Sequence, residues 1–157
     1  MARSTPATTA LTKAGIAHEL AEYDYDPGEG RVGLQAAEAM GVPAGRVFKT
    51  LMIEIDGKPA CAILPSDSEA DMKALAAAFH GKHASMMKPE AAERMTGYKV
   101  GGISPLGQRK RVPTALDASA SDHPTIYVNG GRRGLQIILD PQALAMLLDC
   151  RIVAFAR

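Results

Sequence analysis

Residues 47–65 read as a strand, a turn and a second strand, and this stretch constrains the fold more than any other. The run VFKTLMIEID (47–56) is rich in β-branched and large apolar residues, which is typical of a strand. The dipeptide Asp56-Gly57 then favours a tight hairpin turn, and PACAILP (59–65) supplies the returning strand. We therefore expect an antiparallel hairpin whose second strand ends at Pro65.

A second hairpin and several short helices account for most of the remaining chain. TIYVNGG (125–131) and LQIIL (135–139) are strand-like runs joined by GGRRG (130–134), residues 19–25 look extended, and residues 151–155 favour a last strand. Helical patterns that begin at Pro, Asp or Ser or end at Gly cover residues 5–17, 34–40, 66–81, 89–95 and 141–148. In the third of these we expect Asp67 or Ser68 to be the N-cap and Gly81 to be the stop signal.

The order of these elements predicts the fold class. Strands and helices alternate without a regular βαβ rhythm, and two hairpins require antiparallel pairing, so an α+β fold is favoured over a doubly wound sheet. A chain of 157 residues is long enough to bury about 68–70% of its unfolded surface. We expect one domain over residues 1–157.

The composition argues against a membrane segment, a secretory signal and a metal site. No apolar run approaches the roughly 20 residues that cross a bilayer, and residues 1–13 have no apolar core of signal-peptide length. The expected location is therefore the cytoplasm. Cys61 and Cys150 lie in separate apolar runs, which favours buried thiols. The four histidines lack zinc-ligand spacing, so no metal is expected.

Positive charge is concentrated beside glycine-rich backbone in two loops. Residues 100–114 (VGGISPLGQRKRVPT) hold three glycines, two prolines and three adjacent cations, and GGRRG adds two more arginines. Glycine lets a ligand approach the main chain closely, and cations attract phosphates, so the two loops would suit a polyanion. A solvated positive surface explains the same residues equally well. The scarcity of aromatic residues, with no Trp, argues against a stacking platform for single-stranded nucleic acid.

Lys49 is the polar residue that looks out of place in the first strand. Alternation puts it on one face with Val47, Leu51, Ile53 and Ile55. A lysine in that position either extends its ammonium group to solvent or points it into a cleft, where it could hold an anion or polarise a carbonyl. The chain has no GxSxG or HExxH motif and no Ser or Cys with an obvious base partner. A hydrolytic site here would lack a nucleophile of its own.

Three sequence blocks resemble one family. FKTL (48–51), TGYKVGGISPLGQRKRVPT (96–114) and TIYVNGGRRGLQI (125–137) are similar to the YbaK (EbsC) proteins, freestanding relatives of the editing domain inserted in bacterial prolyl-tRNA synthetases. The resemblance runs in order over nearly the whole chain. It implies a compact α+β domain built around a curved mixed, largely antiparallel sheet, surrounded by helices. It also implies an aminoacyl-tRNA deacylase that removes cysteine mistakenly attached to proline tRNA. Cysteine tRNA charged with cysteine is a further substrate that the resemblance implies.

The resemblance assigns expected roles to particular residues. Those expected at the reacting ester are Lys49, Gly101 and Gly102. Those expected to contact the substrate are Tyr23, Val32, Thr50, Ser104, Pro105, Asn129, Gly130 and Gln136. Those expected to meet tRNA phosphates are Arg109, Lys110, Arg111, Arg132 and Arg133. The expected partners are aminoacyl-tRNA and prolyl-tRNA synthetase, not DNA or a membrane, and no cofactor is expected.

The family's proposed mechanism would explain the missing nucleophile. The thiol of the bound cysteinyl group attacks its own ester carbonyl and leaves as a cyclic thiolactone, so the protein needs only to orient the ester and stabilise charge on its oxygen. The chain departs from the family at Gln136, where a carboxylate is common, at Val32, where an aromatic is common, and at Asn129, commonly serine. Water-mediated editing of alanyl or other small-residue esters, and a noncatalytic module that binds nucleotides or a tRNA end, are the alternatives.

Overall fold

The structure is a computed structural model of the chain that describes residues 4–28 and 31–157. Its helices are short, and within these residues none is long and apolar enough to cross a membrane. The elements, with α for α-helices, η for 3-10 helices and β for strands, are α1 Pro6–Ala14, β1 Glu19–Glu22, α2 Val32–Met40, η1 Ala44–Arg46, β2 Phe48–Ile55, β3 Lys58–Pro65, α3 Met72–Ala78, β4 Ala84–Met86, α4 Pro89–Thr96, β5 Thr114–Asp117, η2 Ala118–Asp122, β6 Ile126–Asn129, β7 Leu135–Leu139, α5 Pro141–Leu148 and β8 Arg151–Val153.

The strands form two sheets rather than the one that was expected. The smaller sheet has the order β1-β7-β6 and is antiparallel throughout, whereas the larger has the order β4-β2-β3-β5-β8. In the larger sheet β2 pairs antiparallel with β3 and β4, and the β3–β5 and β5–β8 pairs are parallel. Both predicted hairpins, β2–β3 and β6–β7, are confirmed. The α+β class with mixed pairing is confirmed as well.

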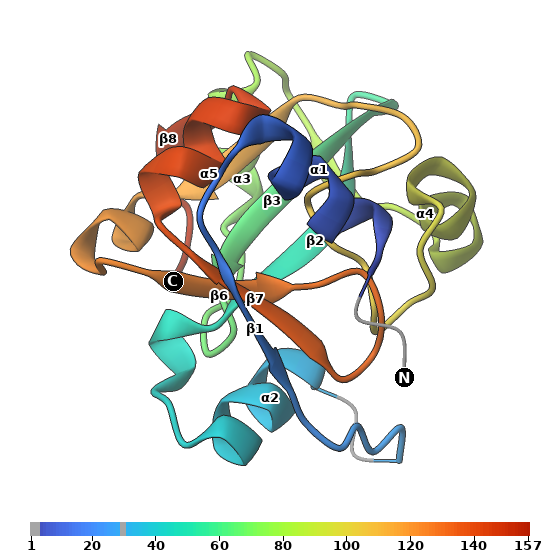
Figure 1. Cartoon of the computed structure of the whole chain (residues 1–157). Helices are drawn as coiled ribbons and strands as arrows, with labels where there is room; N and C mark the ends of the chain where they lie inside the picture. Colours follow the sequence, from blue (N-terminus) through green and yellow to red (C-terminus); the bar gives the residue numbers. More distant parts are fainter. Residues whose placement is uncertain (1–3, 29–30) are drawn as a thin grey trace.

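Among the described residues, one isolated β-bridge connects the two sheets through backbone hydrogen bonding. A single parallel bridge joins Val47, just before β2, to Tyr127 in β6. Beyond this bridge the small sheet crosses the large one, with α1 and α5 at one end of the molecule and α2 at the other (Figure 1). The largest apolar cluster lies between the sheets and includes Phe48 and Met52 from β2 and Val128 from β6. Alternation along β2 explains this, because its even-numbered residues face the small sheet.

The odd-numbered residues of β2 face the opposite way. Ile53 and Ile55 pack with Leu75 of α3 and with Phe155 in a second cluster on the far side of the large sheet. Val47 belongs to a third cluster with α2. Lys49 therefore lies on the same face as these residues, between the second and third clusters, as the alternation predicted.

The ends of most helices are where sequence signals place them. Gly15, Gly41 and Gly97 adopt left-handed backbone angles at the C-caps of α1, α2 and α4, a conformation that glycine reaches without strain. The predicted cap of the third helix is wrong. Its N-cap is Asp71, whose side chain accepts a hydrogen bond from the Ala74 N–H at 3.1 Å.

The chain terminus explains why α3 begins late. Glu69 exchanges two backbone hydrogen bonds of 2.9 Å with Arg157, and the Asp71 N–H donates to the Phe155 carbonyl at 2.7 Å. These contacts keep residues 69–71 extended against the last residues of the chain, so helix cannot form until Met72. α3 also ends early, at Ala78 with Phe79 as its C-cap, not at the expected Gly81. β4 and β5 were not predicted, because runs of three and four residues carry too little periodicity.

Candidate functional site

A cavity of about 260 Å³ lies along the outer edge of β2. β4 covers only Ile53–Ile55 of that edge, and the bridge to β6 lies at Val47. Among the described residues, no strand pairs with residues 48–51 on this side. The consecutive residues 48–52 all line the cavity. At an open edge, side chains from both faces of a strand can reach one space, so Lys49 and Thr50 line the same cavity despite pointing to opposite faces.

The walls of the cavity are mainly apolar. They come from β2, from Met86 at the end of β4, from α4 and its preceding residues, and from the loop that contains Gly101. Four side chains supply polar atoms: Lys49, Thr50, Asn129 and Gln136. In the part of the chain that the structure describes, no Ser, Cys, His, Asp or Glu lines this cavity. The cavity therefore offers a shaped apolar space with one cation and three uncharged polar groups.

Lys49 lies where the cavity meets a second, more polar depression. This depression is lined by Arg31, Ser66, Asp67 and Glu69, and Lys49 lines both spaces. Burial lowers the pKa of the Lys49 ammonium, while the negative charges of Glu69 and Asp67 oppose this effect. A partly desolvated cation interacts more strongly with a carbonyl oxygen or an anion than one in water does.

Two buried polar atoms of the cavity wall have no hydrogen-bond partner within the part of the chain that the structure describes. They are Oε1 of Gln136 and Oγ1 of Thr50. Gln136 is only 2% exposed, and it sits in the middle strand of the small sheet, between Ala21 of β1 and Asn129 of β6. An unpaired buried acceptor usually costs about 1–3 kcal/mol, so such groups commonly mark places where a ligand or water binds.

The two adjacent glycines of the predicted site, Gly101 and Gly102, lie in different environments. Gly101 lines the cavity and has a φ of +91°, a conformation that favours glycine. Gly102 packs against the β6–β7 turn, where an added Cβ would come within 2.9 Å of the backbone of Arg132 and Arg133. The Gly102 N–H donates to the Lys99 carbonyl at 2.8 Å, whereas the Gly101 N–H has no acceptor among the described residues.

The remaining residues expected to contact the substrate divide into two groups. Val32, at the start of α2, and Asn129 line the cavity, and the Asn129 amide donates to the Gly101 carbonyl at 3.2 Å. Four others lie outside its wall. Tyr23 packs with α2, where burial raises its pKa. Ser104 is fully buried in a turn and accepts from the Leu106 N–H, Pro105 borders a different pocket, and Gly130 pairs with Leu135 in the hairpin.

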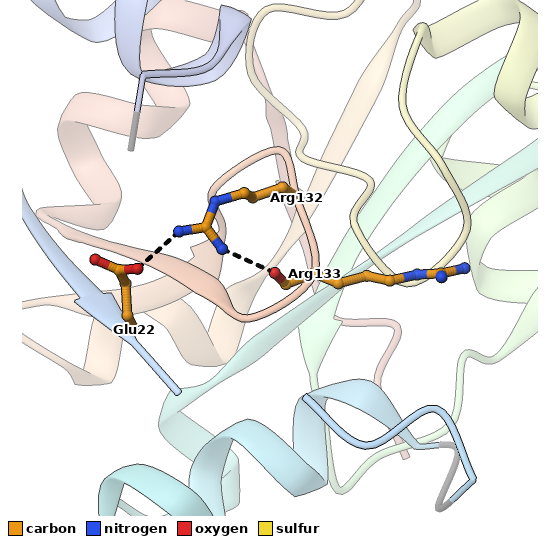
Figure 2. Close-up of polar contacts among 3 residues, drawn as sticks. All are labelled: Glu22, Arg132 and Arg133. Carbon is orange, nitrogen blue, oxygen red and sulfur yellow. Dashed lines mark hydrogen bonds and ion pairs between the residues drawn. The ribbon is translucent and has the colours of Figure 1, made fainter. Parts of the chain in front are cut away.

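None of the five predicted phosphate-binding cations lines the cavity. Arg109, Lys110 and Arg111 are exposed beside α4 and α5, and Arg111 donates to the Leu147 carbonyl at 3.1 Å. Arg132 forms an ion pair with Glu22 at 2.8 Å, and it also donates to the Arg133 carbonyl at 3.0 Å (Figure 2). Arg133 extends in the opposite direction, toward the Gly101 loop (Figure 2).

The two cysteines do not supply a nucleophile. Burial raises the pKa of the Cys61 and Cys150 thiols to about 12, so both stay protonated at neutral pH. Cys61 is buried as predicted, and Cys150 is half-buried. No group of three His, Cys, Asp or Glu side chains able to hold a metal occurs within residues 4–28 and 31–157.

Comparison with known proteins decides the family. A family model described as "Aminoacyl-tRNA editing domain" matches residues 33–147, which include every residue that lines the cavity except Val32. The chain belongs to this family. The editing domain is 38% identical over 131 residues to the protein named "Putative Cys-tRNA(Pro)/Cys-tRNA(Cys) deacylase EbsC" of Enterococcus faecalis, and the match covers 82% of the chain and 79% of that relative.

Two further matches point in the same direction. The editing domain is 31% identical over 90 residues to "Proline--tRNA ligase" of Acidithiobacillus ferrooxidans, a match that covers 57% of this chain and 16% of the ligase. A crystal structure titled as that of "a putative trans-editing enzyme for prolyl tRNA synthetase" superposes with a TM-score of 0.84 at 22% identity and covers 98% of both chains. At this identity the superposition shows the fold, which is the one expected from the sequence blocks.

Proposed function

We propose that this editing domain removes cysteine from mischarged Cys-tRNA(Pro) by letting the substrate's thiol cleave its own ester. The observation that carries the proposal is the composition of the cavity. Lys49 and Gly101 come together in an apolar space whose described walls hold no Ser, Cys, His, Asp or Glu. A deacylase built this way needs a nucleophile from water or from the substrate. The family and the name of the Enterococcus faecalis relative support the substrate.

The proposed step conserves atoms and protons. The cysteinyl sulfur bonds to the ester carbonyl carbon, the bond from that carbon to the ribose oxygen breaks, and the thiol proton is transferred to the ribose oxygen. The products are tRNA with a free terminal hydroxyl and a four-membered cysteine thiolactone, which water then opens. The protein holds the ester in a bent conformation and excludes other arrangements, a contribution that intramolecular reactions exploit strongly.

Two groups of the site would stabilise the transition state. Negative charge develops on the carbonyl oxygen during attack. The partly desolvated Lys49 ammonium and the Gly101 N–H, which has no acceptor among the described residues, are two donors at the cavity wall that would stabilise it. The apolar walls would enclose the small cysteinyl side chain. The polar depression on the other side of Lys49 would accommodate the hydroxyl-bearing ribose.

Water-mediated deacylation is the second candidate, and the unpaired atoms of Gln136 and Thr50 favour it. A water held by these two atoms could attack an alanyl or other small-residue ester that has no thiol. The two mechanisms differ in their dependence on the substrate's side chain, because serine matches cysteine in size but is a much weaker nucleophile.

A panel of proline tRNAs charged with cysteine, serine or alanine tests the proposal. Catalytic amounts of the protein should clear excess Cys-tRNA(Pro) at least about 100-fold faster than Ser-tRNA(Pro), since removal of one key catalytic interaction typically costs that much. Equal rates for the three substrates would refute attack by the thiol and favour water. Absence of multiple turnovers on all of them would indicate a binding module.

Lys49→Met tests the cation at the site. Methionine keeps an unbranched apolar chain of similar reach, so the fold should be retained while kcat falls about 100-fold or more. An unchanged kcat would remove Lys49 from the mechanism.

Comparing Cys-tRNA(Pro) with Cys-tRNA(Cys), with and without prolyl-tRNA synthetase, would show whether tRNA identity is read by the editing domain or by the synthetase as its partner.

A further inference from the structure

The turn between β6 and β7 holds the Gly101 loop through two successive carbonyl groups. The Arg133 Nε–H donates to the Val100 carbonyl at 2.9 Å, and the Asn129 side-chain amide donates to the Gly101 carbonyl at 3.2 Å. Asn129 is the last residue of β6, and Arg133 lies in the turn that follows it. They therefore fasten two consecutive peptide groups of the loop to one rigid element.

Other contacts fix Arg133 itself. Its guanidinium group lies over the ring of Tyr25, with 5.5 Å between the guanidinium carbon and the ring centroid. Its carbonyl oxygen accepts a hydrogen bond from Arg132, which is paired with Glu22 of β1 (Figure 2). The loop is thus tied to the edge strand of the small sheet through a chain of side-chain contacts.

The backbone N–H groups on either side of Gly101 are both hydrogen-bonded. The Val100 N–H donates to the Glu93 carboxylate at 2.8 Å, and the Gly102 N–H donates to the Lys99 carbonyl at 2.8 Å. The Gly101 N–H lies between these two and has no acceptor in the described part of the chain. In a trans peptide group the N–H points opposite to the C=O. By holding the Val100 carbonyl, Arg133 therefore sets the direction of the Gly101 N–H.

We propose that Arg133 is a positioning residue, which orients the Gly101 amide at the cavity rather than binding a tRNA phosphate. The inference rests on the proposed function, in which this amide stabilises the carbonyl oxygen. Close packing supports it, because an added Cβ on Gly101 would lie 3.1 Å from both Nε of Arg133 and the Tyr25 hydroxyl. The guanidinium group therefore contacts the loop directly, and Arg133 is at the same time an exposed residue.

Arg133→Lys separates the two roles. Lysine keeps the positive charge but lacks the planar group that can donate from Nε while it stacks on a ring. For a positioning residue, kcat should fall about 100-fold with little change in KM, since small errors in placement cost that much. The loss should be the same on Cys-tRNA(Pro) and on 3′-cysteinyl adenosine, a substrate without phosphates. Arg133→Ala should be no worse than the lysine variant.

A phosphate contact predicts the opposite result. Lysine would then retain most of the activity, Arg133→Ala would raise KM in a salt-dependent manner, and the adenosine ester would be unaffected. That pattern would overturn the inference. Arg151→Lys is a matched control, because Arg151 also donates to a backbone carbonyl, that of Ala78, and lies over an aromatic ring, that of Phe79. Arg151 does not line the cavity, so the kcat of the Arg151→Lys variant should equal that of the wild type.

A measurement without catalysis tests the geometry alone. In ¹⁵N–¹H NMR spectra the Gly101 amide signal should shift in Arg133→Lys and stay in place in Arg151→Lys. An unshifted Gly101 signal would overturn the inference. Failure of the wild type to deacylate any charged tRNA would instead refute the proposed function, and the spectra would still decide whether Arg133 sets the orientation of the Gly101 amide.

Discussion

Gln136→Met should make the editing domain more stable and less active at the same time. Oε1 of Gln136 is buried in the cavity wall and has no hydrogen-bond partner among residues 4–28 and 31–157, and the residue is 2% exposed. Methionine is also unbranched and of similar length, so it fills the space while removing the unpaired polar atom. The free energy of unfolding should rise by about 1–3 kcal/mol, the usual cost of an unsatisfied buried group. For a domain of this size each kcal/mol corresponds to about 2–4 °C in Tm.

The activity should change in the opposite direction. In the proposed site Oε1 accepts a hydrogen bond from the substrate or from a bound water. Removing Oε1 should therefore weaken transition-state binding by the same amount, about 1–3 kcal/mol, which lowers kcat/KM about 5- to 150-fold. Thermal unfolding followed by circular dichroism measures the stability. Deacylation of Cys-tRNA(Pro) under single-turnover and steady-state conditions measures the activity.

Gln108→Met is the matched control for this substitution. The Gln108 amide is partly buried and already donates to the Ser104 carbonyl at 3.0 Å. The same change there removes a satisfied hydrogen bond, so Tm should fall, by an amount that corresponds to about 0.5–1.5 kcal/mol. A lower Tm for Gln136→Met with unchanged deacylation would refute the argument, because it would mean that the Gln136 amide is satisfied within the protein and has no part in the reaction.

Three further substitutions test the fold and the charges around the site. Burial raises the pKa of Asp117, but hydrogen bonds from Ser119 and from the backbone of residues 155 and 156 outweigh this and lower it overall. Asp117→Asn should therefore lower stability near neutral pH by about 1.5–3 kcal/mol, and urea unfolding should show this difference vanishing as acid protonates the wild-type carboxylate below its lowered pKa. The pKa of Lys49 is lower in the folded protein than its ordinary value of 10.5, so between these two pKa values the unfolded chain binds more protons. The free energy of unfolding should therefore rise with pH across that interval. Measurements of Tm against pH should show that Lys49→Met removes this rise. Gly107→Ala should cost more than about 1 kcal/mol in urea unfolding, because φ is +65° and the new Cβ would lie 2.4 Å from the Pro6 carbonyl oxygen; retained stability would show that α1 shifts freely.

Local signals were sufficient for most of the elements. The Asp56-Gly57 dipeptide predicted the β2–β3 hairpin, and glycines predicted the ends of α1, α2 and α4, because turns and helix caps depend on the backbone preferences of a few neighbouring residues. Where distant segments interact, the same reasoning failed. The start of α3 is set by contacts with the C-terminal residues, more than 80 positions away, which no local capping pattern contains.

For the candidate site, too, local sequence signals predicted some features and long-range packing determined the others. Alternation in β2 marked Lys49 as unusual, and three sequence blocks indicated the family. Both signals depend only on residues that are close together in the sequence. Only the tertiary structure showed that two sheets separate at Val47 and leave an open strand edge, where Lys49, Thr50 and Gln136 line one cavity. It also showed that Arg132 and Arg133 contact Glu22 and the Gly101 loop. The partner of a cation depends on which segments pack together, and packing is a property of the whole chain rather than of any stretch within it.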